Sequence, residues 1–318
     1  PTVGEQRTEF LGTESQKRPF ASAFSHEKEQ AEPGYYSVFL DTYGVKAELT
    51  STERAAMHRY TFPESREAGF ILDMDYNIQQ QINQVMEVEA VNDTVLRGYK
   101  RSAYWAYRQD LYFYAVFSKP FTHTLYTDTV QENGKEIPVC KMLLHFETAE
   151  DEQVLAKFSI SSVDADGACK NLQAEMPGWN FDGVRADAKK KWNECLSKIA
   201  VKTHDEDQRT IFYTAMYHAF LSPNLFTDVD GRYLGMDLKV HTTDRKHTVY
   251  TIFSLWDTFR ALHPLLTIID PQLNTEFIRS LIKKHQEGGI FPKWDCVSNY
   301  TGTMVGYHAA SLVTDSYV

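Results

Sequence analysis

The sequence predicts two segregated domains, a β-sandwich over residues 1–183 and a helical domain over residues 184–318. Apolar residues recur with period two in the first half, as in antiparallel strands, and with period 3.6 from about residue 180, as in amphipathic helices. A chain of 318 residues has room for two domains of about 150 residues. Because the β-rich part precedes the helix-rich part, segregated domains are favoured over an alternating βαβ fold.

The first half is expected to be an antiparallel sandwich. Residues 1–30 are polar with little periodicity, which indicates a loop or an edge segment. Side chains alternate over 36–40 and 45–50, on either side of the turn Asp41–Gly44, and this pattern predicts a β-hairpin. Asn133-Gly134 suits a type I′ turn, because both positions of that turn need positive φ. Further short strands are expected at 111–117, 142–146 and 155–160.

The second half is expected to be helical. Residues 211–220 place apolar side chains along one stripe of a helix that starts with the acids at 205–207 and stops before Pro223. Another helix has Asp270 as its cap and Pro271 at its first position, and it ends at Gly288-Gly289. The remaining predicted helices are a charged connecting helix at 185–199, a helix at 253–266 and an uncapped helix over 309–318.

Composition argues against several classes of protein. The net charge of −10 disfavours a nucleic-acid surface, which needs clustered Lys and Arg. No stretch approaches the ~18 consecutive apolar residues of a membrane span. Motifs of nucleotide-binding loops, nucleophile elbows and zinc proteases do not occur. The cysteines are too scattered for a zinc cluster and are interpreted as buried free thiols: Cys140, Cys169, Cys195 and Cys296.

The densest candidate for chemistry is the segment Ser254–Arg260. Trp256 beside Asp257 suits sugar binding, because an indole covers the apolar C–H face of a pyranose while a carboxylate accepts hydrogen bonds from two hydroxyls. On a helix, Asp257 and Arg260 are three residues apart and face each other. The alternative interpretation is a core tryptophan beside a surface ion pair.

A second cluster follows the Gly-Gly break. A loop that carries Lys, Trp, Asp and Asn suits polyol recognition, and a histidine follows on the next predicted helix. These residues are Lys293, Trp294, Asp295, Asn299 and His308. A satisfied core histidine is the alternative for His308, and Asp295 receives no catalytic role.

The segment Asp228-Val229-Asp230-Gly231 resembles the end of a calcium-binding loop. Phe226 stands where such a loop has an acid. A turn with two solvated acids is the alternative interpretation.

Long segments of the sequence resemble glycoside hydrolase family 92. Segments at 25–27, 31–38, 45–50 and 58–63 are similar to the family's N-terminal sandwich. Segments at 228–233, 250–270, 292–294 and 299–308 are similar to its catalytic domain. The resemblance therefore covers nearly the whole chain in order.

This resemblance implies a fold and an activity. The implied fold is an antiparallel β-sandwich followed by an (α/α)6 barrel, of which this chain holds the first helices, with the active site between them. The implied activity is exo-acting, inverting hydrolysis of α-linked mannose with Ca²⁺ as cofactor. We expect the α-1,2 linkage, in N-glycans or mannans.

The resemblance also implies roles for residues. Trp256-Asp257 matches the family's sugar-binding pair, and weaker candidates for lining the same pocket are Arg260, Lys293, Trp294, Asn299 and His308. The general acid, the base and the main calcium ligands are expected after Val318, so no catalytic residue is expected within the chain and its metal ligands stay unassigned. From the missing start methionine and the uncapped final helix we expect the chain to be a fragment. Because the acid and base are expected outside it, we expect the fragment to be inactive by itself.

The expected partner is a mannose-containing glycan, with no nucleic acid and no membrane span. The family's role in glycan degradation implies a bacterial protein that is secreted, periplasmic or at the cell surface. No oligomeric state follows from the sequence. Two other functions stay open. One is a non-catalytic module that binds glycans or has a structural role, and the other is another sandwich-plus-barrel enzyme, such as a glycoside phosphorylase or a polysaccharide lyase.

Overall fold

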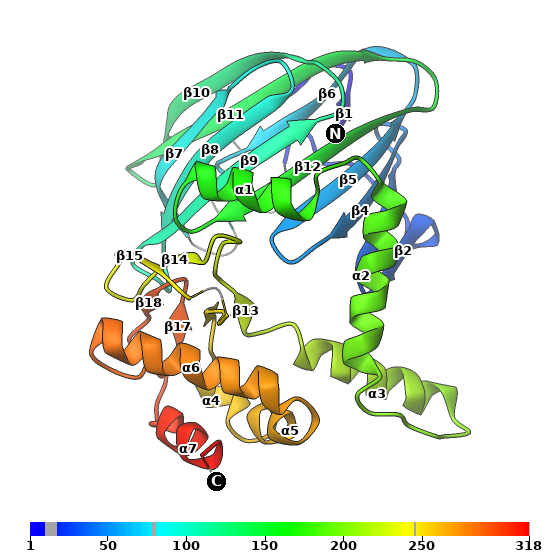
Figure 1. Ribbon diagram of the computed structural model, residues 1–318. Coiled ribbons are helices and arrows are strands. Elements are labelled where there is room, and N and C mark those ends of the chain that lie inside the picture. Colours follow the sequence, from blue (N-terminus) through cyan, green and yellow to red (C-terminus); the bar gives the residue numbers. More distant parts are fainter. Residues whose placement is uncertain (10–17, 78–80, 245, 318) are drawn as a thin grey trace. The chain divides into compact units, whose positions relative to one another are not determined.

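The computed structural model describes residues 1–9, 18–77, 81–244 and 246–317 (Figure 1). They form two compact units. Unit 1 comprises residues 1–104, 110–160 and 164–188, and unit 2 comprises residues 105–109, 161–163 and 189–318. The domain boundary predicted after residue 183 falls inside helix α2 (Phe181–Leu196).

Unit 1 is built on two β-sheets. The smaller sheet has the order β1 (Thr2–Val3), β6 (Ser65–Asp73), β11 (Lys135–Thr148) and β10 (Thr122–Glu132). The larger sheet has the order β2 (Glu29–Glu32), β3 (Tyr35–Leu40), β4 (Val45–Ser51), β5 (Ala55–Phe62), β12 (Glu152–Ser161), β9 (Gln109–Phe117), β8 (Val95–Ala103) and β7 (Ile82–Ala90). A 3₁₀ turn, His26–Lys28, precedes β2. The described strand registers are antiparallel, as in β3 and β4, where Tyr35 lies opposite Thr50.

The core of unit 1 follows from the period of two along these strands. Alternate residues of both sheets, among them Val45, Leu96 and Leu144, are fully buried in one apolar cluster. A second cluster attaches helix α1 (Ala165–Glu175) and the start of α2 to the larger sheet, through Met57, Leu172 and Phe181. Figure 1 shows α1 lying across that sheet. The predicted antiparallel sandwich is therefore confirmed.

The turn chemistry of the sandwich also agrees with the sequence. Asn133 and Gly134 have φ of 52° and 75° between β10 and β11, as a type I′ turn requires. The predicted hairpin is formed by β3 and β4, and Gly44 in its turn has a φ of 64°. Part of the polar segment 1–30, residues 10–17, lies outside the described residues.

Unit 2 is mainly helical. Its helices after α2 are α3 (Glu206–Ala219), α4 (Leu255–Thr258), α5 (Leu262–Ile269), α6 (Pro271–Gly288) and α7 (His308–Asp315). Within the described residues, three two-stranded antiparallel sheets lie between them: β13 (Asn224–Leu225) with β16 (Tyr250–Thr251), β14 (Arg232–Leu234) with β15 (Val240–Thr242), and β17 (Asp295–Cys296) with β18 (Asn299–Tyr300). The predicted start and end of α6 are confirmed, because Asp270 caps it and Gly289 ends it with φ of 79°.

The single helix predicted over 253–266 is wrong, because the chain forms two short helices there. Residues 259–261 separate α4 from α5. Pro264 lies in the first turn of α5, where its missing N–H is not needed. In a continuous helix, its ring would clash with the carbonyl of Arg260. The break leaves the segment 255–258 as a single turn.

The described residues contain no helix long and apolar enough to cross a membrane. All four cysteines are free thiols, two of them buried, as expected, and two half-buried.

Candidate functional site

The Trp256–Asp257 pair lies on a turn that is anchored by buried apolar side chains. Leu255 and Phe253 are fully buried in the core of unit 2, while Trp256 is half-buried and Asp257 is exposed. Ser254 Oγ donates a hydrogen bond of 2.5 Å to Asp257 Oδ2, which fixes the carboxylate, and Oδ1 has no hydrogen bond with another described residue. The core-tryptophan alternative does not describe this geometry, because both members of the pair reach the surface.

Arg260 contacts aromatic rings instead of the acid. Its guanidinium carbon lies 5.5 Å from the centroid of the Trp256 ring and 5.3 Å from that of Phe259. The structure records no ion pair between Asp257 and Arg260 within the described residues, because α4 ends at Thr258 and the helical spacing assumed for that pair does not hold. The surface therefore presents an indole flanked by one carboxylate and one guanidinium.

The second predicted cluster lies beside this turn. A β-bridge joins Ser254 to Trp294, and it brings Lys293 and Trp294 next to the start of α4. Lys293 is half-buried, and its ammonium has no hydrogen bond or ion pair with another described residue. Trp294 packs edge-on against Trp105, with ring centroids 5.4 Å apart. Three segments that are far apart in the sequence, the loop 105–109, residues 254–260 and residues 293–294, therefore contribute two cationic groups and three indoles to the candidate site.

A buried ion pair sets the position of this bridge. Asp295 is fully buried and lies 2.9 Å from Lys284 Nζ. Its carboxylate also accepts hydrogen bonds from Thr251 Oγ1 at 2.8 Å and from the Phe253 N–H at 2.9 Å. These contacts tie the segment before α4 to the segment after α6. Asp295 thus has a positioning role in the described structure.

His308, the first residue of α7, lies beside the aromatic rings of the candidate site. Its ring stacks on Phe259 with centroids 3.9 Å apart and lies 6.1 Å from Trp256. Its Nε2 is buried and has no hydrogen-bond partner among the described residues, so the satisfied-core alternative does not hold for this nitrogen.

Asn299 is placed differently from the other candidates. It is 1% exposed, and its amide nitrogen donates to the backbone carbonyls of Arg108 and Val297. The amide therefore anchors the loop 105–109, and only its Oδ1 has no partner within the described part of the chain.

The acids at 228–230 form a closed turn. Asp228 is 5% exposed and accepts a hydrogen bond from Ser161 Oγ at 2.7 Å. Asp230 lies 2.9 Å from Arg232 Nε. The alternative of two solvated acids is therefore wrong for Asp228. Nor do the described residues, here or elsewhere, include a group of three His, Cys, Asp or Glu side chains that could hold a metal ion.

Sequence reasoning missed two features of unit 2. Trp105 is 40% exposed and reaches Trp294 from the loop 105–109, and the aromatic run at 104–107 was a signal for it. Tyr233 donates to Glu287 Oε1 at 2.5 Å, and burial together with this bond raises the pKa of Tyr233. No local sequence pattern could predict the contact between Tyr233 and Glu287, because the two residues lie 54 positions apart.

Comparison with known families finds a matching domain for each half of the chain. Residues 1–161 match the glycosyl hydrolase family 92 N-terminal domain, and residues 167–318 match the family's catalytic domain. The chain belongs to glycosyl hydrolase family 92.

Solved family 92 structures share this fold. A family GH92 α-mannosidase from Bacteroides thetaiotaomicron is 34% identical with a TM-score of 0.91, covering 99% of this chain and 43% of its own. That enzyme has also been solved in complex with mannoimidazole. A family GH92 inverting mannosidase from the same species is 25% identical with a TM-score of 0.82, covering 94% of this chain and 40% of its own.

A further relative is known only as a glycosidase. It is an uncharacterized secreted glycosidase from Arthroderma benhamiae, 27% identical over 227 residues, which are 62% of this chain and 29% of that protein. The family 92 chain thus spans less than half the length of each of these relatives.

Proposed function

We propose that this family 92 chain is part of an exo-acting α-mannosidase and that the turn 254–257 binds the terminal mannose. The observation that carries the proposal is the outward Trp256–Asp257 pair, fixed by Ser254 and anchored by the buried Leu255. The indole would cover the apolar face of the sugar, and Asp257 Oδ1 would accept hydroxyl hydrogen bonds. Support for mannose comes from the two similar Bacteroides enzymes, both of which are mannosidases.

The neighbouring groups suit roles around the same sugar. Lys293 is a cation without a partner among the described residues and could donate to a hydroxyl or to the linking oxygen. His308 Nε2 is a further group that lacks a partner there. Arg260 lies over Trp256 and would shape the rim of the pocket.

We further propose that hydrolysis inverts the anomeric carbon, with support from the second Bacteroides relative, which is an inverting mannosidase. Inversion needs a general acid and a general base roughly 6.5–9.5 Å apart, with a water molecule between the base and the sugar. We keep the acid and base as groups expected after Val318. The α-1,2 linkage, the N-glycan or mannan substrate and secretion stay part of the proposal, with support for secretion from the secreted fungal relative.

Calcium dependence also stays a proposal for the whole protein. The described residues contain no group of three His, Cys, Asp or Glu side chains that could hold the ion. If the proposal holds, chelation would abolish turnover by the longer protein and added Ca²⁺ would restore it. Full turnover in the presence of a chelator would contradict calcium dependence.

Binding of α-1,2-mannobiose to the 318-residue chain, measured by titration calorimetry, tests the mannose-binding role. Asp257→Ala removes a charged hydrogen-bond acceptor, so we expect about tenfold or greater loss of affinity. Asp207→Asn is the matched control, because Asp207 is an exposed acid of α3 elsewhere in unit 2, and it should bind as the unmodified chain does. Equal affinity of the chain and of Asp257→Ala would contradict the role of Asp257.

Turnover measured on this chain and on the longer protein separates this function from its alternatives. We expect this chain not to hydrolyse α-mannobiose, because the proposal assigns the acid and base to groups after Val318. Substantial hydrolysis would contradict that placement. In the longer protein, a requirement for phosphate would indicate a phosphorylase, and an unsaturated product would indicate a lyase.

A further inference from the structure

Unit 1 contains a cavity that the proposed mannose pocket does not use. It has a volume of about 510 Å³ and lies at the free edge of the larger sheet, around strand β7. Its walls come from β7, β8 and β9, with contributions from β10, β11 and the first residue of α1. Sites for small molecules commonly have volumes of about 300–1,000 Å³. All of its lining residues belong to unit 1.

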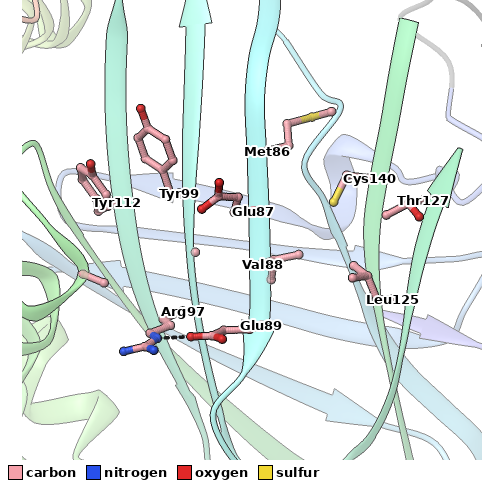
Figure 2. A pocket seen from close by; sticks show the side chains of 12 residues that line it. Met86, Glu87, Val88, Glu89, Arg97, Tyr99, Tyr112, Leu125, Thr127 and Cys140 are labelled. Atoms are coloured by element: carbon pink, nitrogen blue, oxygen red, sulfur yellow. Dashed lines mark hydrogen bonds and ion pairs between the residues drawn. The ribbon is translucent and has the colours of Figure 1, made fainter. Parts of the chain in front are cut away.

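One side of this cavity carries a pair of stacked tyrosines. The rings of Tyr99 and Tyr112 lie 4.5 Å apart at an angle of 21°. Tyr99 is fixed in turn, because its hydroxyl donates to Asp110 at 2.5 Å and Arg101 Nε lies 2.7 Å from the same carboxylate. Figure 2 shows both rings on the same side of β7 as Glu87. The stack is therefore a rigid aromatic platform at the wall of the cavity.

Charged groups lie next to this platform. Glu87 is exposed, lies opposite Tyr99 in the strand register and has no hydrogen bond or ion pair with another described residue. Glu89 forms an ion pair with Arg97 (Figure 2). The cavity thus offers an open carboxylate acceptor close to a guanidinium donor.

The balance of charge selects the class of ligand. Two carboxylates and one guanidinium line the tyrosine side, and the guanidinium is already paired, so an anionic ligand such as a phosphate would be repelled. An aromatic face with hydroxyl-binding groups at its margin fits a neutral sugar ring, whose C–H face is apolar and whose edge carries hydroxyls. The apolar residues Met86, Val88 and Leu125 lie on the other side of β7 in Figure 2.

We propose that the tyrosine side of this cavity is a second, non-catalytic site for a neutral hexose polysaccharide. The choice of α-mannan as that polysaccharide rests on the proposed function, whereas the existence of the site rests on the cavity, the Tyr99–Tyr112 stack and Glu87 alone. Such a site would hold the polymer on the sandwich while its terminal sugar is removed elsewhere.

Affinity electrophoresis of the 318-residue chain in gels that contain yeast α-mannan tests the site, with β-glucan and xylan gels in parallel. We expect mannan to retard the chain. Tyr112→Ala should bind about tenfold more weakly, and Glu87→Gln should lose less affinity. The exposed Glu87 side chain has no hydrogen bond or ion pair with another described residue, so Glu87→Gln should fold normally. Phe24→Ala removes an exposed aromatic ring of unit 1 that does not line the cavity, so it is the matched control and should bind normally. A circular dichroism spectrum confirms that each variant is folded.

The outcomes separate this site from the mannose pocket. Retardation that survives in Asp257→Ala and is lost in Tyr112→Ala supports the second site. Loss of retardation in Asp257→Ala alone, or unchanged binding in both Tyr112→Ala and Glu87→Gln, overturns it. Binding of β-glucan or xylan in place of mannan, with the same dependence on Tyr112, supports the site and overturns its assignment to mannan.

Discussion

Replacing Asp295 by Asn tests whether the buried ion pair positions the candidate site. The side chains of Lys284 and Asp295 are 3% and 0% exposed, and the carboxylate holds the segment 251–253 through three hydrogen bonds. Asparagine keeps an acceptor for the backbone N–H groups but leaves the Lys284 charge unpaired. Breaking a buried pair on one side costs about 3–5 kcal/mol, so we expect Asp295→Asn to lower the free energy of unfolding by about 3 kcal/mol.

Urea unfolding followed by tryptophan fluorescence measures this change, because four of the five tryptophans lie in unit 2. Lys284→Met in the Asp295→Asn background should recover about 1 kcal/mol or more, since it removes the unpaired charge. Asp257→Asn, at an exposed position, is the control and should change stability by about 0.5 kcal/mol or less. A loss below about 1 kcal/mol in Asp295→Asn would refute the positioning role.

Two further predictions concern stability. Burial lowers the pKa of His263 from 6.5 to about 4, so the folded state binds this proton less well than the unfolded state does. Stability should therefore fall by about 3 kcal/mol as the pH drops from 6.5 to 4. Urea unfolding at both pH values measures this loss of stability, which should be smaller in His263→Leu. An equal loss of stability in that variant would show that other titratable groups cause it. Gly134→Ala at positive φ should lower the stability of unit 1 by about 1 kcal/mol without a clash, measured by thermal unfolding, whereas Asn133→Gly should be tolerated.

The fold could be predicted where local patterns decide the structure. Alternation of side chains placed the hairpin at 35–51, and Asn133-Gly134 specified the type of the turn between β10 and β11, because that turn needs positive φ. Asp270 with Pro271 specified the start of α6, because capping and the missing N–H are local effects. The break between α4 and α5 was also local, but apolar periodicity concealed the role of Pro264.

The site could be predicted only in part. The chemistry of Trp256 and Asp257 was readable because the two residues are adjacent. Their relation to Trp294 depends on a bridge across 40 residues, and the contact with Trp105 depends on a loop from the sandwich half of the sequence. Asn299 had the right chemistry for a sugar ligand, yet its amide is used by two backbone carbonyls. Such competition for hydrogen bonds depends on tertiary structure and leaves no pattern in the sequence.

NMR of the indole N–H signals of the five tryptophans, recorded while α-1,2-mannobiose is added to the chain, tests most directly whether the turn 254–257 binds mannose. We expect the signals of Trp256 and Trp294 to shift with a common saturation curve, while those of Trp179 and Trp192 stay in place. Saturable shifts confined to Trp179 or Trp192, or no shift of Trp256 at any concentration, would show that the sugar does not occupy the turn 254–257.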